Sequence, residues 1–189
     1  MGMGYFGSVG FMLAQVLLGL LLLLPVLRVI LPLSRVRFGN PVCQAVYRAT
    51  NPLLVPLGRV LPNWRGLSLG ALVLAWLVAA LAAWLLLAAM GNLLGPLEAA
   101  ALGFGTLLQF TLSLYFWAIV VVALMSFFSP DYGNPAVELV LGVAEPVLKP
   151  FRRIPLRFAG FDLSPLWACL ALRLVKFSLA YFGLPAFPL

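Results

Sequence analysis

The chain contains the same unit twice, and this duplication restricts its fold more than any other feature of the sequence. Asn40-Pro41 reappears as Asn134-Pro135, 94 residues later (134 − 40 = 94). The same shift relates four more positions, in order along the two halves: Pro52 and Pro146, Pro56 and Pro150, Arg59 and Arg153, Gly66 and Gly160. Solenoid repeats are shorter, at about 20 to 50 residues. We therefore predict two tandem, domain-sized repeats, residues 1–94 and 95–189.

The composition indicates an integral membrane protein. Hydrophobic residues make up 64% of the chain and charged residues only 9%, whereas a soluble domain carries about 25% charged residues. The net charge of +7 could suggest a nucleic-acid partner. The basic residues gather in two segments between apolar spans, however, so a membrane topology signal explains them better. We expect no direct binding of nucleic acid.

Four apolar stretches are long enough to cross a bilayer as helices, which takes about 20 residues. They cover approximately residues 10–33, 67–90, 99–128 and 163–182. The first stretch has no basic leader and no convincing cleavage site, so we expect it to be retained as a span. Only helices fit, because a backbone in hydrocarbon must satisfy its own hydrogen bonds. The prediction is an all-α protein with four transmembrane helices, two in each repeat.

The basic residues of the two long connections set the expected orientation. The first connection carries Arg35, Arg37, Arg48, Arg59 and Arg65, and the second carries Lys149, Arg152, Arg153 and Arg157. The two tails and the short middle loop carry no Lys or Arg. Because cytoplasmic loops are enriched in these residues, we expect a multi-pass protein of the bacterial inner membrane with both long connections in the cytoplasm and both termini outside. Two spans per repeat make the repeats parallel.

Each long connection is predicted to hold a short helix that proline ends. Asn40 and Asn134 are typical N-cap residues, and the proline after each suits the first helical position. The helices are expected to end two residues before Pro52 and Pro146, because an internal proline removes a backbone donor and clashes with the preceding turn. The connections are therefore predicted to be Pro-broken.

Beyond these prolines, both segments mix large apolar residues with arginine. This pattern is typical of amphipathic helices that lie in the membrane interface with Arg directed at lipid phosphate, and a re-entrant hairpin fits it as well. Proline and arginine recur at equivalent positions, beyond what charge bias requires. The candidate contacts to anionic lipid or to a partner protein are Pro52, Pro56, Arg59, Pro146, Pro150, Arg152 and Arg153.

Two cations lie inside the fourth predicted span. Arg173 and Lys176 are three residues apart and therefore share a helix face. A mid-span arginine costs about 2.5–3.5 kcal/mol to insert, so such residues usually face protein or water. The pair could serve an ion or substrate pathway or contact an acidic partner helix. Alternatively, Arg173 has a partner in its own bundle and Lys176 snorkels to the outer interface.

Further polar residues lie in the first span of each repeat. Gln15 and Gln109 are equivalent positions, and Thr106 and Ser113 share the helix face of Gln109. Hydrogen bonding between helices explains them, and a polar permeation path is the alternative.

A stripe of small residues recurs every fourth position in the second span: Ala71, Ala75, Ala79 and Ala83. Small residues at this spacing let helix backbones approach closely. The stripe predicts a packing face, either within the monomer or between subunits.

The sequence offers little for catalysis or cofactor binding. The chain has no histidine, which removes histidine-ligated haem, the usual zinc sites and a histidine general base. Cys43 and Cys169 have no cysteine at their equivalent positions, and we expect no disulfide. The carboxylates are scattered and form no catalytic pair. We therefore expect no cofactor, no metal and no enzymatic activity.

The motifs of the connections resemble those of the YggT/YlmG family of small bacterial and plastid membrane proteins. The resemblance covers nearly the whole chain, and the second copy is the closer match, with EPVLKPFRRI at 145–154 and GFDLSP at 160–165. In the first copy, Asn51, Gly58 and Ser68 replace an acidic residue, an arginine and an aspartate of the family pattern. The resemblance implies links to cell division and nucleoid organisation, to osmotic-stress tolerance and, in plastids, to maturation of a covalently haem-bound cytochrome.

Two hypotheses follow for the function. The leading one is a non-enzymatic inner-membrane scaffold or assembly factor, linked to cell division, envelope organisation or cytochrome maturation. Its Pro/Arg segments are expected to bind anionic lipid head groups or unidentified membrane or cytoplasmic proteins. The alternative is a component of a small-ion transporter or channel that acts in osmotic-stress tolerance. A homo-oligomer is compatible with both.

Overall fold

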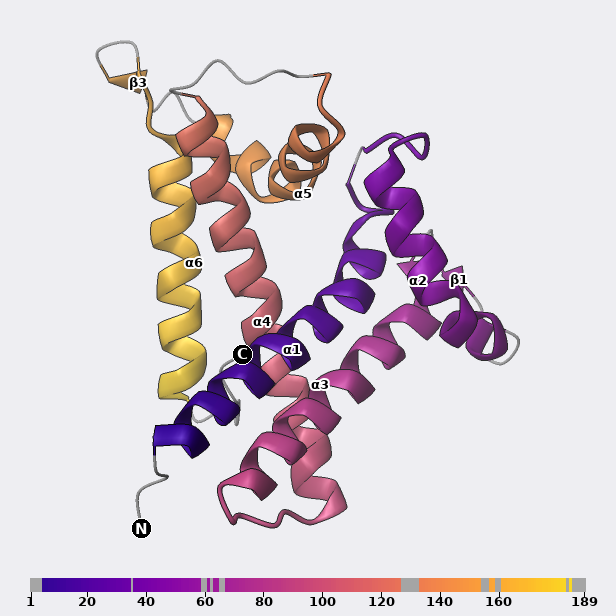
Figure 1. The fold of residues 1–189 in the computed structure, drawn as a ribbon. Helices are drawn as coiled ribbons and strands as arrows, with labels where there is room; N and C mark the ends of the chain where they lie inside the picture. The colour runs from indigo at the N-terminus through magenta and orange to yellow at the C-terminus, as the bar shows by residue number, and fades with distance from the viewer. Residues whose placement is uncertain are drawn as a thin grey trace.

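The computed structural model describes residues 5–34, 36–58, 61, 63–64, 67–126, 133–153, 157–158, 161–182 and 184. Six α-helices and two short β-hairpins follow one another in this part of the chain (Figure 1). The helices are α1 (Tyr5–Ile30), α2 (Pro41–Gly58), α3 (Leu69–Ala89), α4 (Pro96–Met125), α5 (Pro135–Arg152) and α6 (Ser164–Tyr181). The hairpins are β1 (Asn63–Trp64) with β2 (Leu67–Ser68), and β3 (Arg157–Phe158) with β4 (Phe161–Asp162).

The order of elements is the same in both halves: a long helix, a connecting helix, a hairpin and a second long helix. The connecting helices α2 and α5 each have 18 residues and begin 94 residues apart (135 − 41 = 94). Both hairpins are antiparallel, with Asn63 opposite Ser68 in the first and Arg157 opposite Asp162 in the second. The sequence repeat therefore recurs as a repeat of secondary structure.

Three helices in the described part of the chain are long and apolar enough to cross a membrane: α1, α3 and α4. They correspond to the first three predicted spans. The fourth predicted span corresponds to α6, which has only 18 residues and carries Arg173 and Lys176. These two cations lower the apolar character of α6, so it is not among the three, and the fourth span remains a prediction.

The six helices form one body around a shared core. α3 packs against both α1 and α4, and α4 packs against α5 and α6. In Figure 1, α4 and α6 run side by side, α1 and α3 run obliquely to them, and α2 and α5 lie across the end opposite the α3–α4 turn. One hydrophobic cluster contains residues from all six helices, among them Leu22, Val46, Ala75, Ile119, Leu148 and Leu172. The two halves are therefore not separate domains.

The predicted packing face of α3 lies inside the molecule. Ala71, Ala75, Ala79 and Ala83 are all fully buried. On α4, a Cβ added to Gly103 would lie 2.5 Å from the Cβ of Ala80. Since real side chains do not approach so closely, the crossing of α3 and α4 depends on the missing side chain at Gly103.

The prediction that prolines end the connecting helices is wrong. α2 continues through Pro52 and Pro56, and α5 continues through Pro146 and Pro150. All four prolines are exposed. The two in each helix are four residues apart and share a face, so the carbonyls that lose a donor lie on the outer side, where water or head groups can solvate them. Packing of the opposite face offsets the cost of each proline, about 3 kcal/mol.

Candidate functional site

Both connecting helices begin at the predicted N-caps. The Oδ1 atom of Asn40 accepts hydrogen bonds from the backbone N–H of Val42 at 2.9 Å and of Cys43 at 3.4 Å. The Oδ1 atom of Asn134 accepts one from the backbone N–H of Ala136 at 2.9 Å. Each side chain satisfies donors that the first turn leaves open. The N-cap predictions are confirmed.

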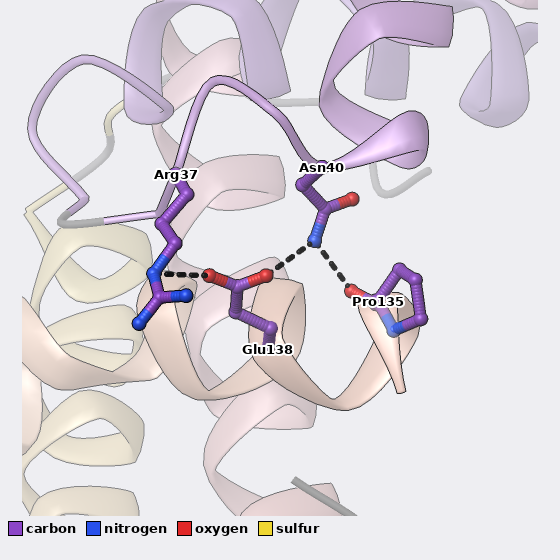
Figure 2. Close-up of polar contacts among 4 residues, drawn as sticks. All are labelled: Arg37, Asn40, Pro135 and Glu138. Atoms are coloured by element: carbon purple, nitrogen blue, oxygen red, sulfur yellow. Dashed lines mark hydrogen bonds and ion pairs between the residues drawn. The ribbon is translucent and has the colours of Figure 1, made fainter. Parts of the chain in front are cut away.

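Asn40 also joins the two repeats. Its Nδ2 atom donates to the backbone oxygen of Pro135 at 2.8 Å and to Oε2 of Glu138 at 3.0 Å (Figure 2). The Nε atom of Arg37 lies 3.9 Å from the other carboxylate oxygen of Glu138. We call these four residues the repeat junction. It ties the start of α2 to the start of α5, which are 94 residues apart in sequence.

Hydrogen bonds to Asn40 hold the repeat junction more firmly than the ion pair does. Asn40 is only 4% exposed, and its amide makes two donor and two acceptor contacts, its full capacity. The Arg37 side chain is 90% exposed, and exposed ion pairs contribute about 0–1 kcal/mol. Removing Asn40 would leave partly buried polar groups without partners, which costs about 1–3 kcal/mol.

Cys43 lies directly behind the repeat junction and is buried. Burial raises the pKa of its thiol above the ordinary value of 9.0, and the negative charge of Glu138 raises the pKa further. The thiolate is the nucleophilic form of cysteine. Cys43 is therefore held as an inert thiol at neutral pH.

The two repeats contribute unequally to the repeat junction. Asn134 occupies the position equivalent to Asn40 but is exposed, and Gln44 occupies the position equivalent to Glu138. One copy supplies the amide and the other supplies the carboxylate. The repeat junction therefore combines positions that are identical in the two copies, Asn40 and Pro135, with positions that differ, Arg37 and Glu138.

Six of the seven predicted Pro/Arg residues lie in the described part of the chain, and all six are exposed. Arg152 donates to Oε2 of Glu145 at 2.9 Å, and both side chains are about half exposed. Arg153 follows at the C-cap of α5 and is exposed. Arg59 lies outside the described residues. The structure thus exposes Arg152 and Arg153 together with the four prolines of α2 and α5.

Lys176 makes a hydrogen bond inside the helix bundle. Its Nζ atom donates to Oγ of Ser113 on α4 at 2.6 Å, and that hydroxyl donates to the backbone oxygen of Gln109 at 2.8 Å. The guanidinium carbon of Arg173 lies 4.5 Å from the centre of the Phe116 ring. Lys176 therefore has an internal partner, whereas Arg173 contacts an aromatic face.

The other predicted polar residues lie on α1 and α4. Thr106 is fully buried, and Gln109 is half-buried. Gln15 lies with Phe110 in an apolar groove of about 450 Å³ between α1 and α4. Ser113, on the same helix face as Gln109, accepts the hydrogen bond from Lys176 of α6.

Sequence reasoning overlooked Arg28. Its guanidinium carbon lies 3.4 Å from the centre of the Tyr47 ring, which links α1 to α2. Its Nη1 atom is buried and has no hydrogen-bond partner in the described part of the chain. The signal was a lone arginine within the first apolar run, where the equivalent position is Val122. A cation–π contact of this kind contributes about 0.5–2 kcal/mol.

Known proteins resemble this chain over most of its length. The CCB3/YggT family model matches residues 8–89 and again residues 101–182. An uncharacterised protein of Pseudomonas aeruginosa is 39% identical over 163 residues, which cover 85% of this chain and 83% of that protein. The uncharacterised protein YggT of Escherichia coli is 32% identical over 155 residues, covering 82% and 80%. An uncharacterised Vibrio alginolyticus protein is 29% identical and covers 87% and 90%.

No solved structure matches the chain significantly. The two matches to the family model cover both halves, as the internal repeat requires. They also agree with the resemblance of the Pro/Arg motifs. The chain belongs to the CCB3/YggT family.

Proposed function

We propose that the protein is a non-enzymatic membrane scaffold or assembly factor, and that the joined helices α2 and α5 form its binding platform. The observation that carries this proposal is the repeat junction. Its partly buried hydrogen bonds hold two amphipathic helices together at one end of the bundle. A fixed platform of this kind suits the recruitment of partners rather than chemistry.

The outer surface of the platform mixes apolar and basic side chains. Leu53 and Val55 of α2 are more than half exposed, and Arg48 of the same helix is exposed. On α5, Lys149 and Arg153 are also exposed. Apolar side chains can enter the acyl boundary while cations meet lipid phosphate. Anionic lipid and the acidic surface of a partner protein fit this chemistry.

The membrane arrangement belongs to the same proposal. α6 would be the fourth span, since it runs beside α4 and exposes large apolar side chains. The platform would then face the cytoplasm of the inner membrane, because the long connections hold most of the Lys and Arg. The family resemblance supports roles in cell division, envelope organisation or cytochrome maturation.

Photo-crosslinking in cells tests the proposal. A photoreactive residue replaces Arg59 or Arg153, and captured proteins are identified by mass spectrometry. We expect division or cytochrome-maturation proteins among the products. The double variant Arg59→Ala, Arg153→Ala, probed from Arg152, should lose the capture while it still inserts. Glu98→Gln, at the start of α4 on the opposite end, is the matched control and should capture normally. Normal capture by the double variant would contradict the proposal.

Transport of small ions is the second candidate. The bond between Lys176 and Ser113 favours it, because it brings a cation and a hydroxyl together between α4 and α6. Purified protein in proteoliposomes should then show an ion flux that Arg173→Leu alters. If no flux is seen and a partner is captured from Arg153, the transport hypothesis is excluded and the scaffold hypothesis remains.

A further inference from the structure

Arg173 occupies the middle of α6. It is nine residues from Ser164 and eight from Tyr181, or about 13 Å and 12 Å along the helix axis. The hydrocarbon core of a bilayer is about 30 Å thick. If α6 spans, Arg173 therefore lies near mid-bilayer, about two helical turns from either end.

Arg173 belongs to an apolar stripe that no other helix covers. The exposed side chains Leu166, Leu170, Arg173 and Phe177 follow one another at spacings of four, three and four residues. This is the spacing with which one helix packs along another. The opposite side, with Ala168 and Leu172, is buried against the bundle. We call the four exposed residues the α6 outer stripe.

The polar edge of Arg173 has no partner inside the described part of the chain. Its guanidinium uses one face against Phe116, and no hydrogen bond or ion pair joins it to another described residue. A guanidinium carries five N–H donors, so most of its capacity remains open. Lys176 differs from Arg173, because its Nζ atom donates a hydrogen bond to Oγ of Ser113. An unpaired arginine in hydrocarbon is costly and usually has a partner.

A second copy of this chain does not fit the stripe. Two parallel copies packed through it would place Arg173 beside Arg173 at the same depth, where like charges repel. The five acidic residues of the chain are Glu98, Asp131, Glu138, Glu145 and Asp162. In the described part of the chain, Glu98 lies in the first turn of α4, Glu138 and Glu145 lie in the connecting helix α5, and Asp162 lies in β4. The described helices α1, α3, α4 and α6 of a second copy therefore offer no carboxylate at this depth.

We propose that the α6 outer stripe binds a transmembrane helix of another protein, and that this helix carries a carboxylate at mid-bilayer. The carboxylate would accept two parallel hydrogen bonds from Arg173, while apolar side chains pack against Leu166, Leu170 and Phe177. This inference rests on the proposed scaffold function and on α6 as a span. It adds the chemistry of one partner.

Designed transmembrane peptides test the inference on the full-length protein. The protein is reconstituted in phosphatidylcholine vesicles at pH 8 with an apolar helical peptide that has one central Glu. Association is measured by energy transfer between labels on protein and peptide. We expect association about tenfold stronger than with the matched central Gln peptide. Arg173→Gln should reduce it to the Gln level, and Arg173→Lys should retain part of it.

Charge exchange supplies the control for misfolding. Arg173→Glu should bind a central Lys peptide in preference to the Glu peptide, which a damaged protein would not do. Equal association of wild type with the Glu and Gln peptides would overturn the inference. The inference would also be overturned if Arg173 affected association only after anionic lipid was added. That result would mean that the arginine binds lipid head groups. Partner capture from Arg153 does not involve Arg173, so a failure here leaves the scaffold proposal standing.

Discussion

At the scale of single residues, identical amino acids at equivalent positions of the two repeats make different contacts. Asn40 caps α2 and bonds across to α5, whereas Asn134 is exposed and caps its own helix. The difference comes from burial: Asn40 lies against the start of α5. Local sequence predicts the capping, because capping depends on the next three residues. It does not predict the bond across the repeats.

Truncation of the two asparagines should separate capping from bonding across the repeats. Asn134→Ala should lower the free energy of unfolding by about 1 kcal/mol, the value of an N-cap. Asn40→Ala should lower it by about 2–4 kcal/mol, because it also leaves the oxygens of Pro135 and Glu138 without their donor. Unfolding of the purified protein in detergent micelles measures both. Equal losses for the two variants would show that the repeat junction adds nothing to stability.

Cys43 predicts how stability depends on alkaline pH. Because the native thiol has a raised pKa, the folded protein keeps its proton above pH 9.0 while the unfolded chain loses it. The unfolded state then binds fewer protons, so the free energy of unfolding falls as pH rises from 9.0 towards the native pKa, by at most about 1.4 kcal/mol per pH unit. Unfolding measured between pH 7 and 10.5 should show this slope.

Cys43→Ala is the control for that slope. The variant lacks the thiol, so its free energy of unfolding should fall less steeply above pH 9.0 than that of the wild type. Below pH 8 the two curves should run parallel, offset by the lost side-chain packing. Identical slopes above pH 9.0 would mean that Cys43 ionises as easily in the folded protein as in the unfolded chain.

At the scale of elements, the prediction from the prolines of the connecting helices was wrong, whereas the prediction from the alanine stripe of α3 was correct. Proline was expected to end the connecting helices, yet Pro52 and Pro146 lie inside them on the exposed side. The rule failed because tertiary packing of the buried face outweighs a local cost at the surface. The alanine stripe of α3 was predicted correctly, since regular spacing is visible in sequence. Its counterpart, Gly103 on α4, was not predicted, because a close approach depends on how two helices cross.

Substitution of Gly103 tests that crossing. In Gly103→Ala the new Cβ would meet both the Cβ and the Cα of Ala80, at 2.5 Å and 2.6 Å. Backbone atoms cannot rotate away, so α3 and α4 must separate, and we expect a loss of about 1–3 kcal/mol of unfolding free energy. Gly10→Ala in α1 meets nothing within 4 Å and should be neutral or slightly stabilising. Thermal unfolding in one detergent compares them, and unchanged stability of Gly103→Ala would contradict the tight crossing.

At the scale of the whole molecule, the sequence predicted the repeat but not how the copies interlock. A shift of 94 residues anticipates that the order of elements recurs. It does not reveal that α3 of the first copy packs against α4 of the second, or that one core includes all six helices. At the repeat junction, Asn40 has an identical equivalent in Asn134, whereas Glu138 is replaced by Gln44 in the other copy. Internal similarity therefore shows what was duplicated, but it does not show where the copies meet.

The number of spans is the property of the whole molecule on which the remaining proposals depend. Three helices meet the requirements of length and composition, and α6 decides whether the chain crosses an odd or an even number of times. Single cysteines at Ser8, Arg152 and Phe182, in a Cys43→Ala, Cys169→Ala background, can be labelled with an impermeant reagent on intact cells. With four spans, Ser8→Cys and Phe182→Cys react from outside, and Arg152→Cys reacts only after the inner face is opened.

The position at Phe182 separates the arrangements because it follows directly after α6. If α6 does not cross, Phe182→Cys should behave like Arg152→Cys, and both should be protected in intact cells. Arg173 would then lie in the interface or in water, where an arginine needs no carboxylate partner. If Phe182→Cys reacts together with Ser8→Cys, the helix crosses with Arg173 near mid-bilayer. The guanidinium must then find its partner within the membrane, because water is absent there and Phe116 covers only one face.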